Sequence, residues 1–257
     1  MSDAVLRERQ GHIEILTINR PEARNAINGA VSKAFTEAFD ELERDDECNV
    51  VIVTGSGDKA FCAGMDLKAF AAGEAGDIMG ARGGFGGIAQ RDFPKPLIAA
   101  VNGSALAGGC EIMLSCDLAV AVEGAKFGIP EVKRGLMAGA GGLIRLPKRI
   151  PPAIALELAL TGDPIDAQRA LSIGLINRVV PAAGLMESAL ELAGTIAANA
   201  PLAVRSSKKV MRQAGELPEA EGWKINNDAM PAVFGSADAM EGAVAFAEKR
   251  APVWTGK

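Results

Sequence analysis

The chain has 257 residues, of which 49% are hydrophobic and 23% charged, and its formal net charge is −5. These proportions are ordinary for a globular protein and exclude a disordered chain, and the acidic balance argues against a nucleic-acid-binding protein. The length suits one large domain, or a domain with an appendage.

The first strong pattern is an apolar strand followed by an amphipathic helix. Residues 13–18 are rich in isoleucine and end at a turn signal containing Pro21. After Asn28, a residue type that caps helices, apolar residues recur every three or four positions from Val31 to Leu42. This spacing predicts a helix that buries one face.

Four short apolar runs then predict buried strands. Each run is rich in apolar or β-branched residues, and helical segments separate the runs. Strands that are apolar at every position are buried on both faces, so the pattern predicts an α/β fold. The runs are residues 50–54, 97–101, 118–122 and 176–180.

Residues 73–87 change the character of the chain, because seven of these fifteen positions are glycine. Such a segment does not readily hold a helix. We expect either a mobile flap over a site or an exposed surface loop.

Helical patterns dominate the rest of the chain. Their apolar faces, added after an α/β core, are candidates for contacts between subunits. The predicted helices are residues 185–199, 201–213, 218–234 and 236–250.

Rare residue types exclude further chemistry. The chain has no tyrosine, and His12 is its only histidine. His12 lies in an alternating stretch, so we expect a solvated strand residue rather than a catalytic one. The four cysteines include no C-x-x-C pair, which indicates reduced thiols. We therefore expect a cytoplasmic protein without a metal site. No apolar run is long enough for a membrane span.

Two glycine-rich corners remain after the common nucleotide-binding and serine-hydrolase motifs are found to be absent. The corners are AFCAGMDL at residues 60–67 and VNGSALAGGCE at residues 101–111, and each follows a predicted strand. Small residues allow close backbone approach, and exposed N–H groups at a helix start attract an anionic oxygen. Two such groups facing one point would form an oxyanion hole.

Two glutamates stand near these corners. Glu111 lies three residues beyond Gly108, and Glu131 follows Pro130. Either one suits a catalytic carboxylate, but first-turn glutamates are also favoured by the helix dipole alone. Spacing leaves both interpretations open.

Four motifs together resemble the crotonase (enoyl-CoA hydratase/isomerase) superfamily over nearly the whole chain. Residues 236–254, with LPK at 146–148 and PPAI at 151–154, most resemble the carnitinyl-CoA dehydratase (crotonobetainyl-CoA hydratase) branch. The four motifs are RPEARNA at residues 20–26, the two corners, and FGIPE at 127–131 with the Gly-Gly pair at 141–142.

This resemblance implies an α/β fold, a spiral of ββα units in residues 1–195, and a helical oligomerisation region in residues 196–257. It also implies a homotrimer or a dimer of trimers, and a substrate that carries coenzyme A. No separate cofactor is expected.

The resemblance also assigns the site. It implies that the backbone N–H groups of Met65 and Gly108 bind the thioester oxygen, and that Glu111 and Glu131 are catalytic. Lys249 is expected to reach the phosphates of CoA, either in its own or in a neighbouring subunit. Further CoA contacts are implied for Ala23, Arg24, Ala26, Ala63, Gly64, Asp66, Leu67, Lys68 and Gly109.

Two carboxylates favour hydration, since one activates water and the other protonates the α-carbon. We expect Glu111 to act on the water and Glu131 to transfer the proton, with these roles exchangeable. The alternatives are an isomerase or other enolate chemistry, and a non-catalytic acyl-CoA-binding paralogue. Ala107 and Ala138 depart from the glycine and proline common in the family, and both are expected to reshape the acyl pocket.

Overall fold

The computed structural model describes residues 4–215 and 217–257. Its main sheet has six strands in the order β1-β2-β3-β5-β7-β10. β1 pairs antiparallel with β2, and the other neighbours pair in parallel. The strands span Val5–Gln10, Ile13–Ile18, Val50–Gly55, Leu97–Val101, Leu118–Val122 and Arg178–Val180.

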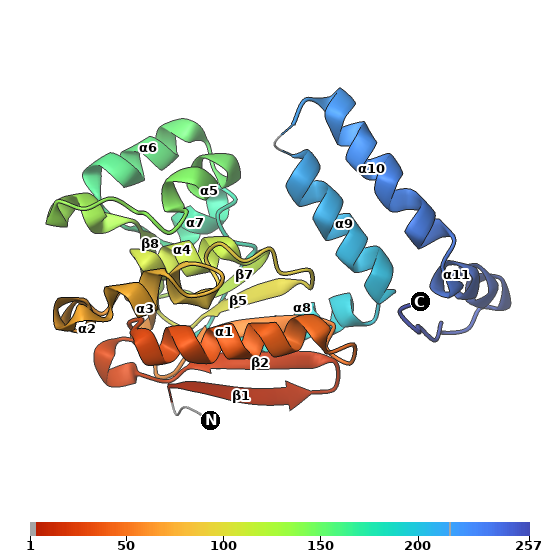
Figure 1. Cartoon of the computed structure of the whole chain (residues 1–257), viewed down its shortest axis with the longest axis horizontal. Coiled ribbons are helices and arrows are strands. Elements are labelled where there is room, and N and C mark those ends of the chain that lie inside the picture. Colours follow the sequence, from red (N-terminus) through yellow and green to blue (C-terminus); the bar gives the residue numbers. More distant parts are fainter. Residues whose placement is uncertain (1–3, 216) are drawn as a thin grey trace.

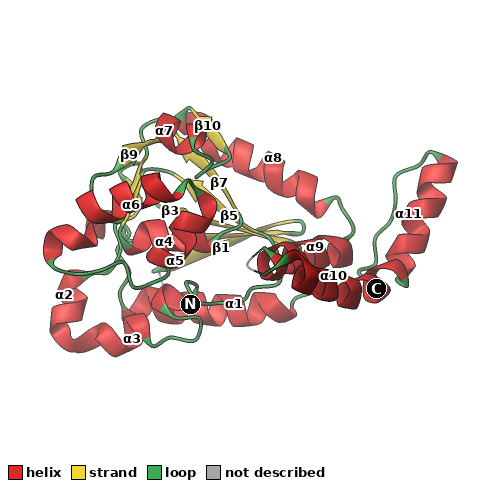
Figure 2. Ribbon diagram, turned by 90° about the horizontal axis from the view of Figure 1, so that it is seen from above, coloured by secondary structure: helices red, strands yellow, loops and turns green. Residues whose placement is uncertain are grey.

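Helices cover both faces of this sheet, which explains why its inner strands β2, β3, β5 and β7 are almost continuously apolar. All residues of β3 and β5 are buried. The strands run between α1 (Gly29–Arg44) and α8 (Leu185–Ala197), as Figures 1 and 2 show. A strand covered on both sides is stabilised by apolar residues at every position.

A second sheet, in the order β4-β6-β8-β9, makes the fold a repeated unit. Each of β3, β5 and β7 is followed by a short strand of this sheet and then by a helical segment. This strand–strand–helix repeat confirms the α/β spiral implied by the resemblance. The short strands are β4 (Ala60–Cys62), β6 (Ser104–Leu106), β8 (Lys126–Gly128) and β9 (Ile165–Asp166).

The helical segments after the short strands are α2 (Leu67–Ala69), α4 (Gly108–Ser115) and the 3₁₀ turn Pro130–Arg134. No helix in the described ranges has the length and apolar character needed to cross a bilayer. The other helices are α3 (Ala75–Met79), α5 (Gly142–Arg149), α6 (Pro152–Thr161), α7 (Ala167–Ser172), α9 (Pro201–Ala214), α10 (Glu219–Phe234) and α11 (Ala237–Glu248).

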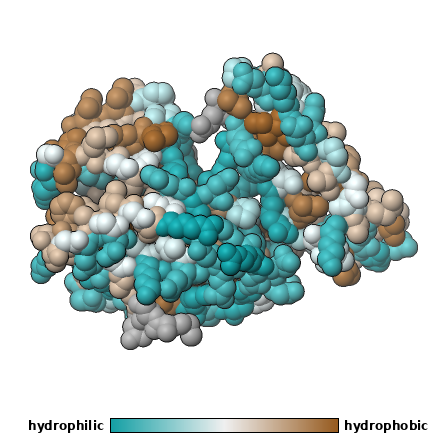
Figure 3. Space-filling model, viewed as in Figure 1, coloured by the Kyte–Doolittle hydropathy of each residue, from teal (hydrophilic) through white to brown (hydrophobic). Residues whose placement is uncertain are grey.

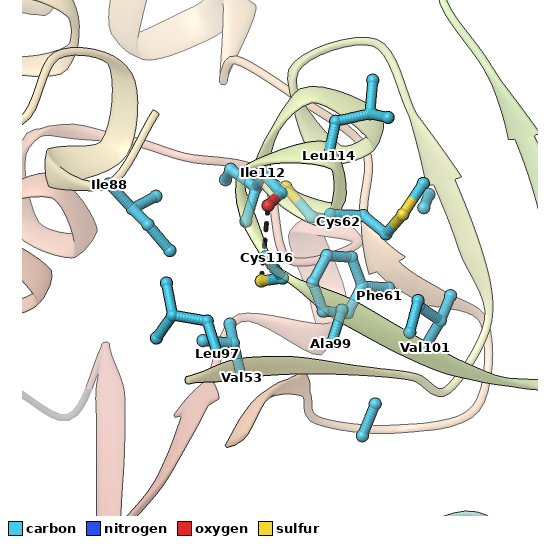
Figure 4. Close-up of a cluster of buried hydrophobic side chains, with 14 of the residues drawn as sticks. Val53, Phe61, Cys62, Ile88, Leu97, Ala99, Val101, Ile112, Leu114 and Cys116 are labelled. Atoms are coloured by element: carbon cyan, nitrogen blue, oxygen red, sulfur yellow. Dashed lines mark hydrogen bonds between the residues drawn. The ribbon is translucent and has the colours of Figure 1, made fainter. Parts of the chain in front are cut away.

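The core fixes α4 against the sheet. Figure 4 shows apolar side chains of β4, β5 and α4 meeting in one cluster. Phe61, Ile112 and Val101 are fully buried there, so α4 cannot shift without disrupting close packing. All four cysteines are buried and free, as their spacing predicts.

Most elements lie where the sequence predicts them. Asn28 caps α1, because its side-chain oxygen accepts a hydrogen bond from the Val31 amide at 3.1 Å. The predicted strand at 176–180 is shorter, since only Arg178–Val180 pairs with β7. β1 was not predicted, because this edge strand is largely exposed and polar. His12 lies in the exposed turn between β1 and β2 rather than in a strand.

The glycine-rich segment 73–87 is more structured than predicted. It contains α3, so the expectation that it holds no helix is wrong. Its second half packs against α1, since Phe85 is buried and a methyl group on Gly87 would lie 2.6 Å from Oγ1 of Thr36. An exposed surface loop therefore does not describe residues 85–87.

The helices α9, α10 and α11 form an arm that extends away from the sheets (Figure 1). Asp117, which follows α4, anchors the arm through ion pairs to Lys208 at 2.8 Å and Arg212 at 2.7 Å. Large apolar side chains remain exposed on the arm, and Figure 3 shows them as brown patches. The most exposed are Met211, Phe234, Met240 and Phe246.

Candidate active site

The two glycine-rich corners meet backbone to backbone. A methyl group on Gly64 would lie 2.9 Å from the nitrogen of Gly108, and one on Gly109 would lie 1.9 Å from the carbonyl oxygen of Cys62. Side chains at Gly64 and Gly109 would therefore separate β4 from the start of α4. Glycine is required here because two chain segments approach more closely than a Cβ allows.

Each corner leaves one backbone N–H group unused by regular structure. Ile27 pairs with the residues flanking Met65, donating to Gly64 at 2.8 Å and accepting from Asp66 at 2.9 Å. The N–H of Met65 therefore faces away from Ile27. Gly108 is the first residue of α4, where amides have no partner within the helix.

Ala107 gives the second corner its sharp turn into α4. It has φ 52° and ψ −131°, in the region that favours glycine. Its amide donates to the carbonyl of Gly128 at 2.9 Å, which ties the turn to β8. Ala107, which replaces the glycine common in the family, thus places a side chain at a backbone conformation that favours glycine.

Glu111 lies one turn into α4 and is only 3% exposed. Its Oε1 accepts hydrogen bonds from the amides of Ala140 at 2.7 Å and Gly142 at 2.8 Å. Burial raises the pKa of this carboxyl, whereas the two amides and the charge of Arg145 act to lower it. The loop at residues 138–142 therefore holds one carboxylate oxygen in place.

Glu131 lies in the 3₁₀ turn Pro130–Arg134, which Pro130 opens. Its Oε2 is buried and has no hydrogen-bond partner among the described residues. Burial, opposed by a hydrogen bond from its own backbone amide and aided by the charge of Glu111, raises the pKa of Glu131 to about 7. The two carboxyls therefore act on one another, and Glu131 is readily protonated near neutral pH.

The segment that carries Ala23, Arg24 and Ala26 lies against the first corner. The amide of Ala63 donates to the carbonyl of Arg24 at 3.1 Å. Arg20 donates to the carbonyl of Ala26 at 2.6 Å and pairs with Asp66 at 2.9 Å. The structure thus brings together the residues of both motifs.

Asp66, Leu67 and Lys68 lie at the start of α2. The carboxylate of Asp66 caps this helix by accepting from the amides of Lys68 and Ala69, and it also binds Arg20. Those hydrogen bonds contribute to the lowered pKa of Asp66. Leu67 is 56% exposed, so its side chain is open to a ligand.

A cavity of about 300 Å³ adjoins the segment that carries Arg24 and adds a residue that the sequence did not single out. It is lined by Arg24 and Lys59, among others. Lys59 stands in the turn between β3 and β4, directly before the first corner. The position of this lysine, next to the first corner, is the sequence feature that could have identified it.

Lys249 lies apart from the other candidates. It ends α11 in a left-handed conformation and is exposed. Figure 1 shows α11 at the far end of the arm, away from α2 and α4. Within one chain, therefore, Lys249 does not join the site.

Within the described parts of the chain, no three His, Cys, Asp or Glu side chains gather as a metal site requires.

Comparisons with known proteins identify the family. The profile of the enoyl-CoA hydratase/isomerase family matches residues 8–257. The chain belongs to this family. It is 46% identical to carnitinyl-CoA dehydratase of Salmonella typhi, with both chains fully covered.

Two solved structures extend the comparison. An enoyl-CoA hydratase from Mycobacterium tuberculosis H37Rv is 49% identical with a TM-score of 0.95, covering 99% of this chain and 100% of the other. A carnitinyl-CoA hydratase from Mycobacterium avium is 47% identical with a TM-score of 0.79, and both chains are fully covered. The crotonase-type fold and the family resemblance predicted from the motifs are confirmed.

Proposed function

We propose that this chain is an enoyl-CoA hydratase, a hydro-lyase that reversibly adds water to an α,β-unsaturated acyl-CoA thioester. The observation that carries this proposal is a pair of glutamates in unlike surroundings, one buried and one half-buried. Glu111 is held by two amides, whereas an oxygen of Glu131 has no partner in the described structure. Isomerisation of a double bond needs one carboxylate, but hydration uses two.

In the proposed mechanism, the N–H groups of Met65 and Gly108 bind the thioester oxygen and stabilise the enolate that forms there. Ionised Glu111 orients a water molecule and accepts its proton as the oxygen attacks the β-carbon. Neutral Glu131 donates a proton to the α-carbon. A proton then passes from Glu111 to Glu131, which restores the starting state.

The unlike surroundings of the two carboxyls support these roles. The pKa of about 7 leaves about half of Glu131 protonated at neutral pH, so the acid form is available. Burial also raises the pKa of Glu111, but two amides and Arg145 oppose this and favour its ionised form, as a base requires. The roles reverse when the reaction runs as a dehydration.

We also propose how CoA is held. Residues of both motifs would line its adenine and pantetheine, with Arg24, Lys59 and Lys68 near its phosphates. Lys249 would contribute from a neighbouring subunit. The other proposed contacts are Ala23, Ala26, Ala63, Gly64, Asp66, Leu67 and Gly109.

No cofactor is needed in this proposal, because the thioester itself delocalises the developing charge. We further propose that residues 196–257 assemble the chain into a trimer or a dimer of trimers, around a spiral core of residues 1–195. The apolar side chains exposed on the arm support this assembly. The free cysteines fit a reducing compartment such as the cytoplasm.

The test is hydration of crotonyl-CoA by E111Q and E131Q. Each variant should lose about 10²- to 10⁴-fold in kcat, while calorimetry shows that it still binds a saturated acyl-CoA. Glu157, exposed on α6, supplies the control E157Q, which should match the unmodified chain. Full activity in either site variant would refute the mechanism.

The same assay separates the alternatives. Reaction in ¹⁸O-labelled water introduces label only if the chain hydrates its substrate, and movement of the double bond without label would indicate an isomerase. Tight binding without turnover over a wide panel would indicate a non-catalytic paralogue. Because the relatives carry both enoyl-CoA and carnitinyl-CoA names, the panel should include crotonobetainyl-CoA.

A further inference from the structure

Arg145 lies behind the loop that holds Glu111. It belongs to α5, and its guanidinium reaches three neighbouring segments. Nη2 donates to the carbonyl of Ala89 at 2.6 Å, and Nη1 donates to the carbonyl of Ala140 at 3.4 Å and to Oγ of Ser115 at 3.3 Å. One side chain thus ties the loop, the end of α4 and the segment after Phe85–Gly87 together.

Two of these contacts lead directly to Glu111. Ala140 accepts from Arg145 through its carbonyl and donates its own amide to the Glu111 carboxylate at 2.7 Å. Ser115 donates to the backbone carbonyl of Glu111 at 2.8 Å. Arg145 therefore supports Glu111 from both the carboxylate side and the backbone side.

The loop is shaped around the guanidinium. A methyl group on Gly141 would lie 2.3 Å from Nη1 of Arg145, and Gly141 has φ 106°. Only glycine suits both the conformation and the space. A methyl group on the next residue, Gly142, would lie 3.1 Å from Oε1 of Glu111. Little more than the backbone of this loop therefore lies between the guanidinium of Arg145 and the carboxylate of Glu111.

The charges around Arg145 are unbalanced. Within residues 4–215 and 217–257, Arg145 forms no ion pair with a carboxylate, unlike Arg212, which pairs with Asp117. Arg149 and Arg212 repel its charge, while Glu111 attracts it. Cys116 also interacts with Arg145, while Glu131 and Cys110 are the other ionisable groups that interact with Glu111. The field of Arg145 therefore acts on Glu111 across the loop.

We propose that Arg145 is a positioning residue that fixes the Glu111 carboxylate and keeps it ionised for attack by water. This inference rests on the proposed role of Glu111 as the base. Arg145 touches no reacting atom. It acts through the amides of the 138–142 loop and through its charge.

The test compares R145M and R145K with a matched control. Arg149 lies one turn further along α5 and donates to the carbonyl of Cys116 at 2.8 Å, without contacting the loop. R145M should lower kcat about 10- to 100-fold with KM within twofold, and the acidic limb of its pH profile should move to higher pH. R145K should keep the limb near its original pH but lose part of kcat. R149M should leave the profile in place.

A double variant distinguishes this inference from the proposed function. If E111Q is inactive, adding R145M should lower the residual rate no further, because both changes remove the same function. An unchanged acidic limb in R145M, or an equal loss of kcat in R149M, would overturn the positioning role while leaving Glu111 catalytic. Full activity in E111Q would instead refute the proposed function. If R149M does not fold, R169M, at an exposed position of α7, takes its place.

Discussion

Glu111 and Glu131 differ in what satisfies their oxygens, and this difference sets their protonation. Backbone amides compensate for the burial of Glu111. The buried Oε2 of Glu131 has no such compensation in the described structure. A carboxyl that loses water without gaining donors is neutralised more easily than it is charged. The oxygen of Glu131 that lacks a donor therefore favours acidity over stability.

Replacing Glu131 by glutamine should stabilise the fold at high pH. The folded-state pKa of about 7 lies above the ordinary value of 4.5, so the folded protein binds the extra proton and stability falls as pH rises from about 4.5 to 7. Glutamine does not ionise, so E131Q should escape that loss. Urea unfolding should show a larger gain for E131Q at pH 8 than at pH 5. An equal effect at both pH values would mean that Glu131 is not unusually protonated.

Replacing Ala107 by glycine should also stabilise the fold. An alanine at φ 52° and ψ −131° is strained by about 1 kcal/mol or more, and glycine relieves this. The control is A105G, the same change at a buried position in β6 without a positive φ. Both variants gain the same freedom when unfolded, so their difference reports the strain at Ala107 together with the buried methyl group that A105G loses. Thermal unfolding should show A107G more stable than A105G by over 1 kcal/mol, with kcat of A107G within a few-fold of the unmodified chain.

At the scale of elements, the site depends on how closely α4 approaches β4. Gly109 has no room for a Cβ, because a methyl group would lie 1.9 Å from the Cys62 carbonyl. G109A should push these elements apart, destabilising the fold by about 1–3 kcal/mol or more. It should also reduce kcat, because the amide of Gly108 moves with α4. Urea unfolding and the hydration assay measure the two effects.

Gly124 provides the control for that prediction. It is exposed, and a methyl group there would meet nothing within 4 Å. G124A should therefore leave both stability and kcat close to those of the unmodified chain. Equal behaviour of G109A and G124A would show that the two corners tolerate separation.

Elements with strong periodicity were predictable from the sequence, and contacts between distant segments were not. The pattern from Val31 to Leu42 specified α1 because one apolar face is enough to define a helix. Strand β1 escaped prediction, since its edge position permits polar residues such as those of Val5–Gln10. Phe85 was hidden among glycines that sequence reasoning takes for a loop, although its ring is buried.

The site was predictable only in part for the same reason. Both glutamates and both corners could be identified from motifs. Their support could not, because Arg145 and the amide of Ala140 reach Glu111 from about 30 residues further along the chain. Sequence separation hides such a contact even when every participant is an ordinary residue.

At the scale of the whole molecule, the arm of α9, α10 and α11 is the part least explained by a single chain. Phe234 and Phe246 are 75% and 87% exposed, which is unfavourable in water unless another surface covers them. Lys249 ends this arm, away from the site that it is proposed to serve. One association of chains would both bury the phenylalanines and bring Lys249 to a neighbouring site.

Replacing Phe246 by glutamate should therefore dissociate the assembly. The unmodified chain should sediment at three or six times its mass of 26.5 kDa, and F246E should shift towards a single chain, because a carboxylate is costly to bury. Its KM for the acyl-CoA should rise with dissociation if Lys249 acts between subunits. A30E, which introduces the same acid at an exposed position of α1, should keep the assembled mass. A single-chain mass for the unmodified protein would leave the exposed phenylalanines uncovered and would rule out the proposed trimer.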